Sequence, residues 1–193
     1  MSDETVHLVR RGGRFEDEGG RVTTWSVAGG SRGRRWRWVT VGPGVDQVAA
    51  HTLETTLDAR FNRLESAGQR GLLTLHVEPD GRVHGHRVTG GGVEHVALGV
   101  PASGLALVGT GPVGDAAFVS GIGQAAEPVR TETLIVTNGL GVEVAEVVVR
   151  PLGRRAVEIE VAGVARRLEL DGDGLPVVPG GDAWPLELDG RGA

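Results

Sequence analysis

Histidine supplies the first candidates for chemistry in this chain. His84 and His86 stand two residues apart in a run that alternates as a strand, so both side chains lie on one face. Two imidazoles in this arrangement can begin a transition-metal site. The third ligand would have to come from His95, Glu94 or Glu78. The alternative is a pair of solvated or pocket-lining side chains.

The turn before His84 and His86 determines which residues of the preceding strand lie opposite these two histidines. The Asp-Gly dipeptide at 80–81 lies between two β-rich runs and predicts a hairpin with a two-residue turn. With that turn, Val77 faces His84 and Leu75 faces His86. His76 then points to the opposite face and is not expected to be a ligand.

Gly109, Gly111 and Gly114 form a G-x-G-x-x-G pattern after an apolar run. In dinucleotide-binding folds, such glycines bring a tight turn up to a pyrophosphate at a helix N-terminus. Here two further glycines within residues 121–123 disfavour a following helix, and the next strand ends in Asn138 instead of an acidic residue. The pattern therefore favours a glycine-rich β connection, and no cofactor is predicted.

Residues 32–38 read R-G-R-R-W-R-W, a mixture of basic and aromatic side chains that suits phosphate contacts and base stacking. The net charge of −5 disfavours nucleic-acid binding, so no nucleic-acid partner is predicted. We interpret the segment as an edge strand whose arginines face water while Trp36 and Trp38 cover the core. Residues 29–33 read G-G-S-R-G and are interpreted as a turn, not as a nucleophile elbow, and no catalytic residue is assigned, so the sequence favours binding over catalysis.

Short β-type runs separated by turn signals dominate the chain. About ten to twelve strands are predicted, at the spacing typical of antiparallel β folds. The predicted fold is mainly β: a single-domain antiparallel β-roll or open barrel, with room for one short helix near residues 115–120. Residues 51–64 fit both strand and helix patterns, with strand favoured.

Residues 1–20 are charged and glycine-rich, and we interpret them as a loose N-terminal arm with a short strand at 6–9. Residues 21–190 are predicted to form the single β domain. The chain has no cysteine, which excludes disulfides and thiolate metal sites. We expect no signal peptide and no integral membrane segment, because no apolar run approaches roughly 18 residues. The cytoplasm is the expected location.

Three segments carry a family resemblance: Val22-Thr23-Thr24-Trp25, the hairpin at 73–88, and L-E-L-D-G-D-G-L at 168–175 followed by Val178-Pro179-Gly180. In these the chain resembles bacterial glycolipid-binding proteins with a spiral β-roll. The resemblance implies a rolled sheet that holds an apolar ligand. The T-P-x-T-N-T and Q-x-Y segments of that family are absent here, so no binding residue is carried over.

The predicted function is non-catalytic binding of an apolar or amphipathic molecule, a lipid or glycolipid, in the concavity of a curved sheet. The predicted lining residues are Trp36, Trp38, Leu53, Leu57, Phe61, Leu75, Val77, Val157 and Ile159. The alternative is that these side chains pack against each other and leave no lumen. Two other functions stay open: a nucleotide- or metal-dependent enzyme that uses the 109–114 loop or the His84 and His86 pair, and a structural or protein-interaction subunit. No oligomeric state is predicted.

Overall fold

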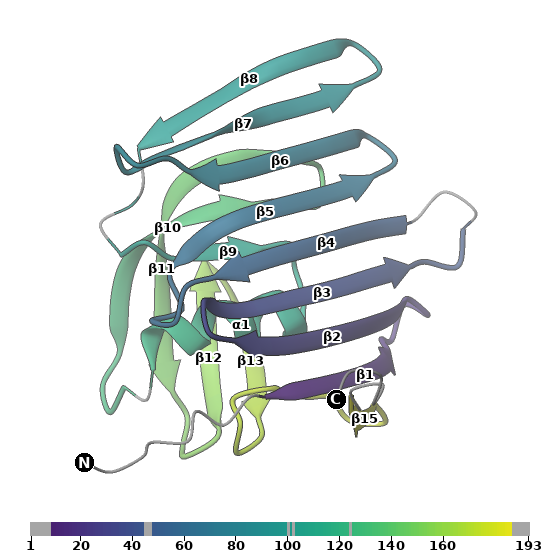
Figure 1. The fold of residues 1–193 in the computed structure, drawn as a ribbon. Coiled ribbons are helices and arrows are strands. Elements are labelled where there is room, and N and C mark those ends of the chain that lie inside the picture. The colour runs from purple at the N-terminus through teal and green to yellow at the C-terminus, as the bar shows by residue number, and fades with distance from the viewer. Residues whose placement is uncertain (1–8, 45–47, 100, 102, 124, 187–193) are drawn as a thin grey trace, which may run out of the picture.

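A computed structural model describes residues 9–44, 48–99, 101, 103–123 and 125–186. In this part of the chain two β-sheets enclose one helix, and the strands of the smaller sheet run across those of the larger one (Figure 1). The fold is mainly β, with a large antiparallel sheet, a smaller curled sheet and one short helix, which confirms the predicted class.

The large sheet has nine strands in the order β15-β1-β2-β3-β4-β5-β6-β7-β8, each antiparallel to its neighbours. Its strands are β1 (Arg10–Glu16), β2 (Val22–Gly30), β3 (Gly33–Val41), β4 (Val48–Thr55), β5 (Phe61–Gly68), β6 (Gly71–Val77), β7 (Arg82–Thr89), β8 (Gly92–Gly99) and β15 (Asp182–Pro185). Alternation along each strand buries one face and leaves the other exposed. In β3, Trp36 and Trp38 are buried while Arg35, Arg37 and Val39 are exposed.

The smaller sheet has six strands in the order β14-β13-β12-β11-β10-β9. They are β9 (Ala106–Val108), β10 (Val129–Val136), β11 (Val142–Pro151), β12 (Ala156–Val161), β13 (Val164–Leu170) and β14 (Pro176–Val177). One pair departs from the antiparallel expectation, because β9 and β10 run parallel. Helix α1 (Pro112–Ile122) makes the crossover between them, which parallel neighbours require.

Helix α1 lies between the sheets and fills the space that they enclose (Figure 1). Every residue from Val113 to Val119 is buried, as expected of a helix in a core and not of one on a surface. Pro112 opens the helix, where a missing N–H has no cost. The helix predicted near 115–120 is thus confirmed, and the glycines at 121 and 123 stand at its end.

A buried ion pair ties the helix to the smaller sheet. The Arg166 guanidinium on β13 donates two hydrogen bonds to the Asp115 carboxylate on α1, at 2.6 and 2.7 Å. Burial raises the pKa of Asp115, and the two hydrogen bonds from Arg166 oppose that effect. Removing one partner from such a pair leaves an uncompensated charge in the core, so the pair fixes the position of α1.

Several expectations about elements need correction. Arg10–Glu16 belongs to the segment interpreted as a loose arm, yet it forms β1 and pairs with both β2 and β15. The strand expected at 6–9 falls, apart from Val9, outside the described residues. β3 is not an edge strand, because β2 and β4 flank it. Residues 51–64 resolve into the end of β4, a turn and the start of β5, so neither part is helical.

Among the described residues, no helix has the length and apolar character needed to cross a membrane.

Candidate functional site

Two rows of side chains on the inner face of the large sheet form the floor of a cleft between the sheets. The first row, crossing β2 to β5, consists of Trp25, Trp38, His51 and Ser66, of which Trp38 and His51 line the cleft. The second row consists of Thr23, Thr40, Ala49 and Gly68. Because the second row is built from small residues, it leaves open space above it. The cleft has a volume of about 370 Å³, within the range of small-molecule sites.

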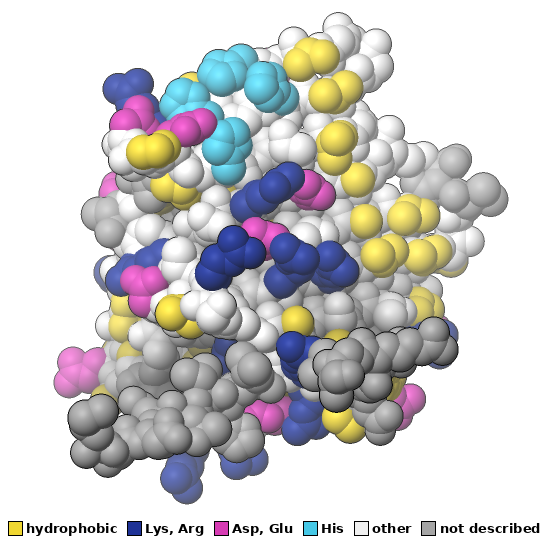
Figure 2. Space-filling model, in the orientation of Figure 1, with side chains coloured by type: hydrophobic (Ala, Val, Ile, Leu, Met, Phe, Trp, Pro, Cys, Tyr) yellow, Lys and Arg dark blue, Asp and Glu magenta, His cyan; other side chains and the backbone are white. Residues whose placement is uncertain are grey.

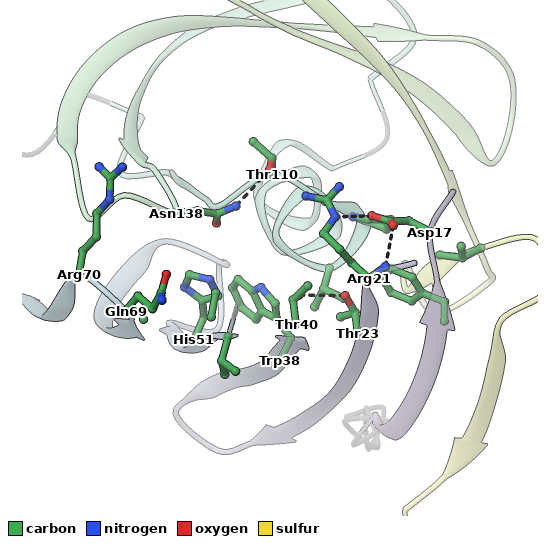
Figure 3. Close-up of a pocket in the computed structure, with 18 residues that line it drawn as sticks. Asp17, Arg21, Thr23, Trp38, Thr40, His51, Gln69, Arg70, Thr110 and Asn138 are labelled. Atoms are coloured by element: carbon green, nitrogen blue, oxygen red, sulfur yellow. Dashed lines mark hydrogen bonds and ion pairs between the residues drawn. The ribbon is translucent and has the colours of Figure 1, made fainter. Parts of the chain in front are cut away.

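The opposite wall comes from the start of α1 and from the turn between β10 and β11 (Figure 3). Gly111, Pro112 and Val113 line it where the helix begins. The Asn138 side-chain amide donates to the Thr110 hydroxyl at 3.3 Å and joins the two segments. The first N–H groups of a helix have no partner within the helix, so this wall favours an acceptor or an anion.

His51 is the buried titratable group of the floor, with 4% of its surface exposed. Its ring stacks on Trp38 with a centroid separation of 4.8 Å. Burial lowers the pKa of the His51 imidazole to about 4, so the ring is neutral at pH 7. A neutral imidazole has one donor and one acceptor nitrogen to offer.

The hydroxyl of Ser66 fixes one of these nitrogens. Ser66 Oγ lies 2.9 Å from His51 Nδ1, and Ser66 is fully buried. A ligand in the cleft therefore has no access to this hydroxyl as a nucleophile. His51 Nε2 has no hydrogen-bond partner among the described residues and faces Gly109, where an added Cβ would lie 3.7 Å away. Nε2 therefore offers one hydrogen bond toward the cleft.

Charged groups stand at both ends of the cleft (Figure 3). At one end Arg21 Nε donates to the Asp17 carboxylate at 2.7 Å. The backbone N–H of Arg21, together with its guanidinium, lowers the pKa of Asp17. At the other end lie Gln69 and Arg70. No carboxylate in the described part of the chain pairs with Arg70, so the cleft carries one uncompensated positive charge.

Each of the three glycines in the G-x-G-x-x-G pattern has a visible structural role. Gly109 adopts a φ of +67°, and an added Cβ would lie 2.8 Å from Asn138 Oδ1. Gly111 caps the helix with a φ of +151°. A Cβ on Gly114 would lie 2.1 Å from the carbonyl oxygen of Val108, so the helix packs directly on β9. The pattern leads from strand β9 into helix α1. The prediction that these glycines form a connection between two β-strands is therefore wrong.

Most of the predicted lining residues lie in the packed core, although Trp38 also lines the cleft. Those in the core are Trp36, Trp38, Leu53, Phe61, Leu75 and Ile159. Val77 and Val157 are partly buried against that core. Leu57 lies in the turn between β4 and β5 and is 70% exposed. The interior is therefore filled by side chains and by α1, and the open space lies at its margin.

The sequence interpretation missed His51, Arg70 and Asn138. His51 carried a signal, because the alternation of β4 places it on the same face as Leu53. A histidine on a buried strand face is a candidate site residue. Arg70 and Asn138 lie in turns, and no local pattern marks them.

A second hollow, of about 670 Å³, lies at the other end of α1. Val157 lines it, together with Arg34 and the turns at 153–155 and 171–174. These turns are largely exposed, and the hollow has no counterpart to the buried His51. The cleft at the start of α1 is therefore the stronger candidate site.

The histidines of the hairpin are arranged differently from the expectation. His76 lies opposite His84, and His86 lies opposite Thr74, one residue from the predicted register. The loop has three residues, because the N–H of Glu78 bonds the Arg82 carbonyl at 2.8 Å and Gly81 takes a φ of +77°. A type I turn followed by a left-handed glycine gives this loop length. His76 therefore shares a face with His84 and His86, and its predicted position on the opposite face is wrong.

The fold and cleft define a class: a mainly β protein with two sheets packed around a core helix and a mixed polar and apolar cleft between them. A solved structure of similar fold is that of a DUF1089 family protein from Pseudomonas aeruginosa. It aligns with a TM-score of 0.50 and 14% identity, over 87% of this chain and 88% of that one. At this identity the likeness shows the fold alone, and the description of that protein names no ligand. No family model and no curated protein matches the chain.

Proposed function

We propose that this protein binds, without catalysis, an apolar or amphipathic ligand of the lipid or glycolipid class, and that the polar end of the ligand occupies the cleft between the sheets. The observation that carries the proposal is the composition of this cleft. Apolar and aromatic side chains form part of its lining, and uncompensated polar groups converge on the rest. Ligand sites in proteins typically combine an apolar lining with a few well-placed polar groups.

The apolar part of the lining suits a hydrocarbon or the apolar face of a sugar. It comes from the large sheet, from the start of α1 and from the residue after β14: Phe15, Trp38, Val48, Ala49, Pro112, Val113 and Val178. Burial of apolar area contributes about 25 cal/mol per Å², so even a short alkyl segment gains affinity here. The limited volume fits the head of an amphipathic molecule better than a whole diacyl lipid.

The polar part favours a headgroup rich in hydroxyl, carbonyl or anionic oxygen. His51 Nε2, the Arg70 guanidinium and the Asn138 amide lie on three sides of the cleft (Figure 3). The start of α1 adds a partial positive charge, which attracts oxygen atoms. The family resemblance of the sequence to glycolipid-binding proteins supports the same ligand class.

The binding test uses the full chain and two probes, a fluorescent long-chain fatty acid and a monoglycosylated diacylglycerol. We expect saturable binding of at least one probe at one molecule per chain, by fluorescence and by native mass spectrometry. Ala49→Phe should abolish binding because it fills the floor of the cleft. Ala67→Phe, on the exposed face of the neighbouring strand β5, is the matched control and should bind normally.

A second pair of variants tests the polar end. Arg70→Ala should weaken binding by about tenfold or more, since a charge-assisted hydrogen bond contributes about 1.5–3 kcal/mol. Arg37→Ala removes an exposed arginine from the other face of the large sheet and should leave affinity unchanged. Bare protein in every spectrum, or equal binding by Ala49→Phe and the native chain, would contradict the proposal.

A nucleotide-dependent enzyme is the second candidate. The observation in its favour is the position of the 109–114 loop, between a strand and a helix and on the wall of the cleft. Against it, β10 is followed by Asn138 where dinucleotide folds place an acidic residue. ATP and NAD should give no thermal shift if the lipid assignment is right, whereas a shift that Arg70→Ala removes would favour the nucleotide.

A further inference from the structure

The exposed face of β6, β7 and β8 gathers four histidines from three strands into one patch (Figure 2). His76 on β6 lies opposite His84 on β7, and His86 on β7 lies opposite His95 on β8. This outer surface of the large sheet faces away from the cleft and from helix α1. A function of the patch is therefore independent of the ligand proposed above.

Three of the four rings are in contact. The ring of His95 lies 5.6 Å from that of His84 and 5.4 Å from that of His86, measured between centroids. His95 thus stands between two side chains that the strand period places on one face. His76 is engaged elsewhere, because its Nε2 lies 2.7 Å from a carboxylate oxygen of Glu78.

We propose that His84, His86 and His95 form a binding site for one divalent transition-metal ion of the zinc class. When two imidazoles bind one ion at about 2.0–2.1 Å, their ring centroids lie roughly 5 Å apart. The two observed separations are close to this value. Imidazole is a favoured ligand of zinc, copper and nickel, and calcium and magnesium prefer oxygen ligands.

Closure around an ion requires the side chains to turn. As they stand, no group of three His, Cys, Asp or Glu side chains in the described residues is arranged to hold a metal. His86 and His95 are exposed and His84 is half-buried, so their rotation meets little packing resistance. Ala97 lies opposite His84, and its small side chain leaves room beside the patch.

The surroundings permit a bound cation. The neighbours of the patch on the same face include Thr74, opposite His86, and two arginines. Arg82 stands two residues before His84 on β7 and lies 4.0 Å from the Asp80 carboxylate, and Arg63 lies opposite His76. The Arg63 guanidinium is paired with the Glu65 carboxylate at 2.6 Å, so its charge is compensated. Three imidazoles leave the solvent side of the ion open, and water would complete a tetrahedral set there.

The test is a calorimetric titration of the full, untagged chain with ZnCl₂ near neutral pH. We expect one zinc ion per chain. His84→Asn, His86→Asn and His95→Asn should each weaken binding by at least about tenfold, because loss of even an outer-shell partner has effects of that order. His76→Asn is the matched control and should bind normally. Binding should also weaken on acidification, because a ligating imidazole must be unprotonated.

Imidazole ¹H–¹⁵N correlation spectra give an independent measurement, since zinc should shift the resonances of His84, His86 and His95 and spare His76. The three substitutions lie on an exposed face, and the metal-free variants should unfold like the native chain. The proposal is overturned by the absence of saturable heat, by one ion shared between two chains, or by equal loss of binding in His76→Asn.

Discussion

Among single residues, His51 links the stability of the fold to the chemistry of the cleft. Its ring is buried against Trp38, and Ser66 holds one nitrogen. Burial disfavours the charged imidazolium because the core does not solvate it. His51 lines the cleft, and its Nε2 has no partner among the described residues, so this nitrogen is available to a ligand. The cleft thus has a neutral imidazole that can form a hydrogen bond with a ligand, and the burial of this imidazole makes the folded protein less stable in acid.

Acidification should therefore unfold the protein partly through His51. Its pKa is about 4 in the folded protein, against an ordinary value of 6.5. The unfolded chain binds the additional proton, so stability falls as the pH drops from 6.5 to 4 and is unaffected by this group above 6.5. The full contribution is about 3 kcal/mol. Urea unfolding curves across that pH range measure it.

The variant His51→Gln provides the comparison, because its amide keeps a hydrogen bond to Ser66 but does not titrate. Its unfolding free energy should depend less on pH than that of the native chain between pH 4 and 6.5. Identical pH dependence in the two proteins would show that His51 is not the titrating group.

At the scale of elements, the contact between β9 and α1 positions the wall of the cleft. Gly114 allows the helix to lie directly on the strand, and the Asp115 pair with Arg166 holds its other side. The first turn of α1 therefore has little freedom to move. These contacts hold in place the residues at the start of α1 that line the cleft.

Gly114→Ala should destabilise the protein by about 1–3 kcal/mol, as overpacking does. Alanine is intrinsically the better helix former by about 1 kcal/mol, so a stabilisation would be expected if propensity dominated. The added Cβ meets the Val108 carbonyl oxygen at 2.1 Å, and the helix must shift. Chemical denaturation measures the change. Gly90→Ala, in a turn with open space, should alter stability by less than about 0.5 kcal/mol.

Local patterns predicted the strands well because alternation and turn residues act over a few positions. The alternation of residues 36–41 places Trp36 and Trp38 inward, as β3 confirms. The register of the hairpin was wrong by one residue, because loop conformation and not the Asp-Gly dipeptide alone sets it. The cleft was out of reach, since His51, Arg70 and Asn138 come together only when the two sheets pack.

On the scale of the whole molecule, the large sheet joins distant parts of the chain. β15 pairs with β1, so a strand from the C-terminal region covers the edge of a strand from the N-terminal region. Trp184 on β15 packs beside Gly12 on β1. An uncovered strand edge presents unpaired N–H and C=O groups to other chains. β15 is thus expected to protect the fold from association.

A chain that ends at Gly181 lacks β15 and should be less stable by about 1–3 kcal/mol. It should also associate as its concentration rises, which analytical ultracentrifugation detects. A chain that ends at Leu186 retains β15 and serves as the control. If the two truncated chains have the same stability and the same mass at all concentrations, β15 has no protective role.

The same pairing of β15 with β1 has a consequence for folding during synthesis on the ribosome, because β1 is made long before the strand that pairs with its outer edge. β1 ends at Glu16, whereas β15 begins only at Asp182. At bacterial and eukaryotic translation rates, β1 waits on the order of ten to thirty seconds for its outer neighbour. During that interval the outer edge of β1 has unpaired N–H and C=O groups, and a chaperone that binds unfolded chains has time to cover it.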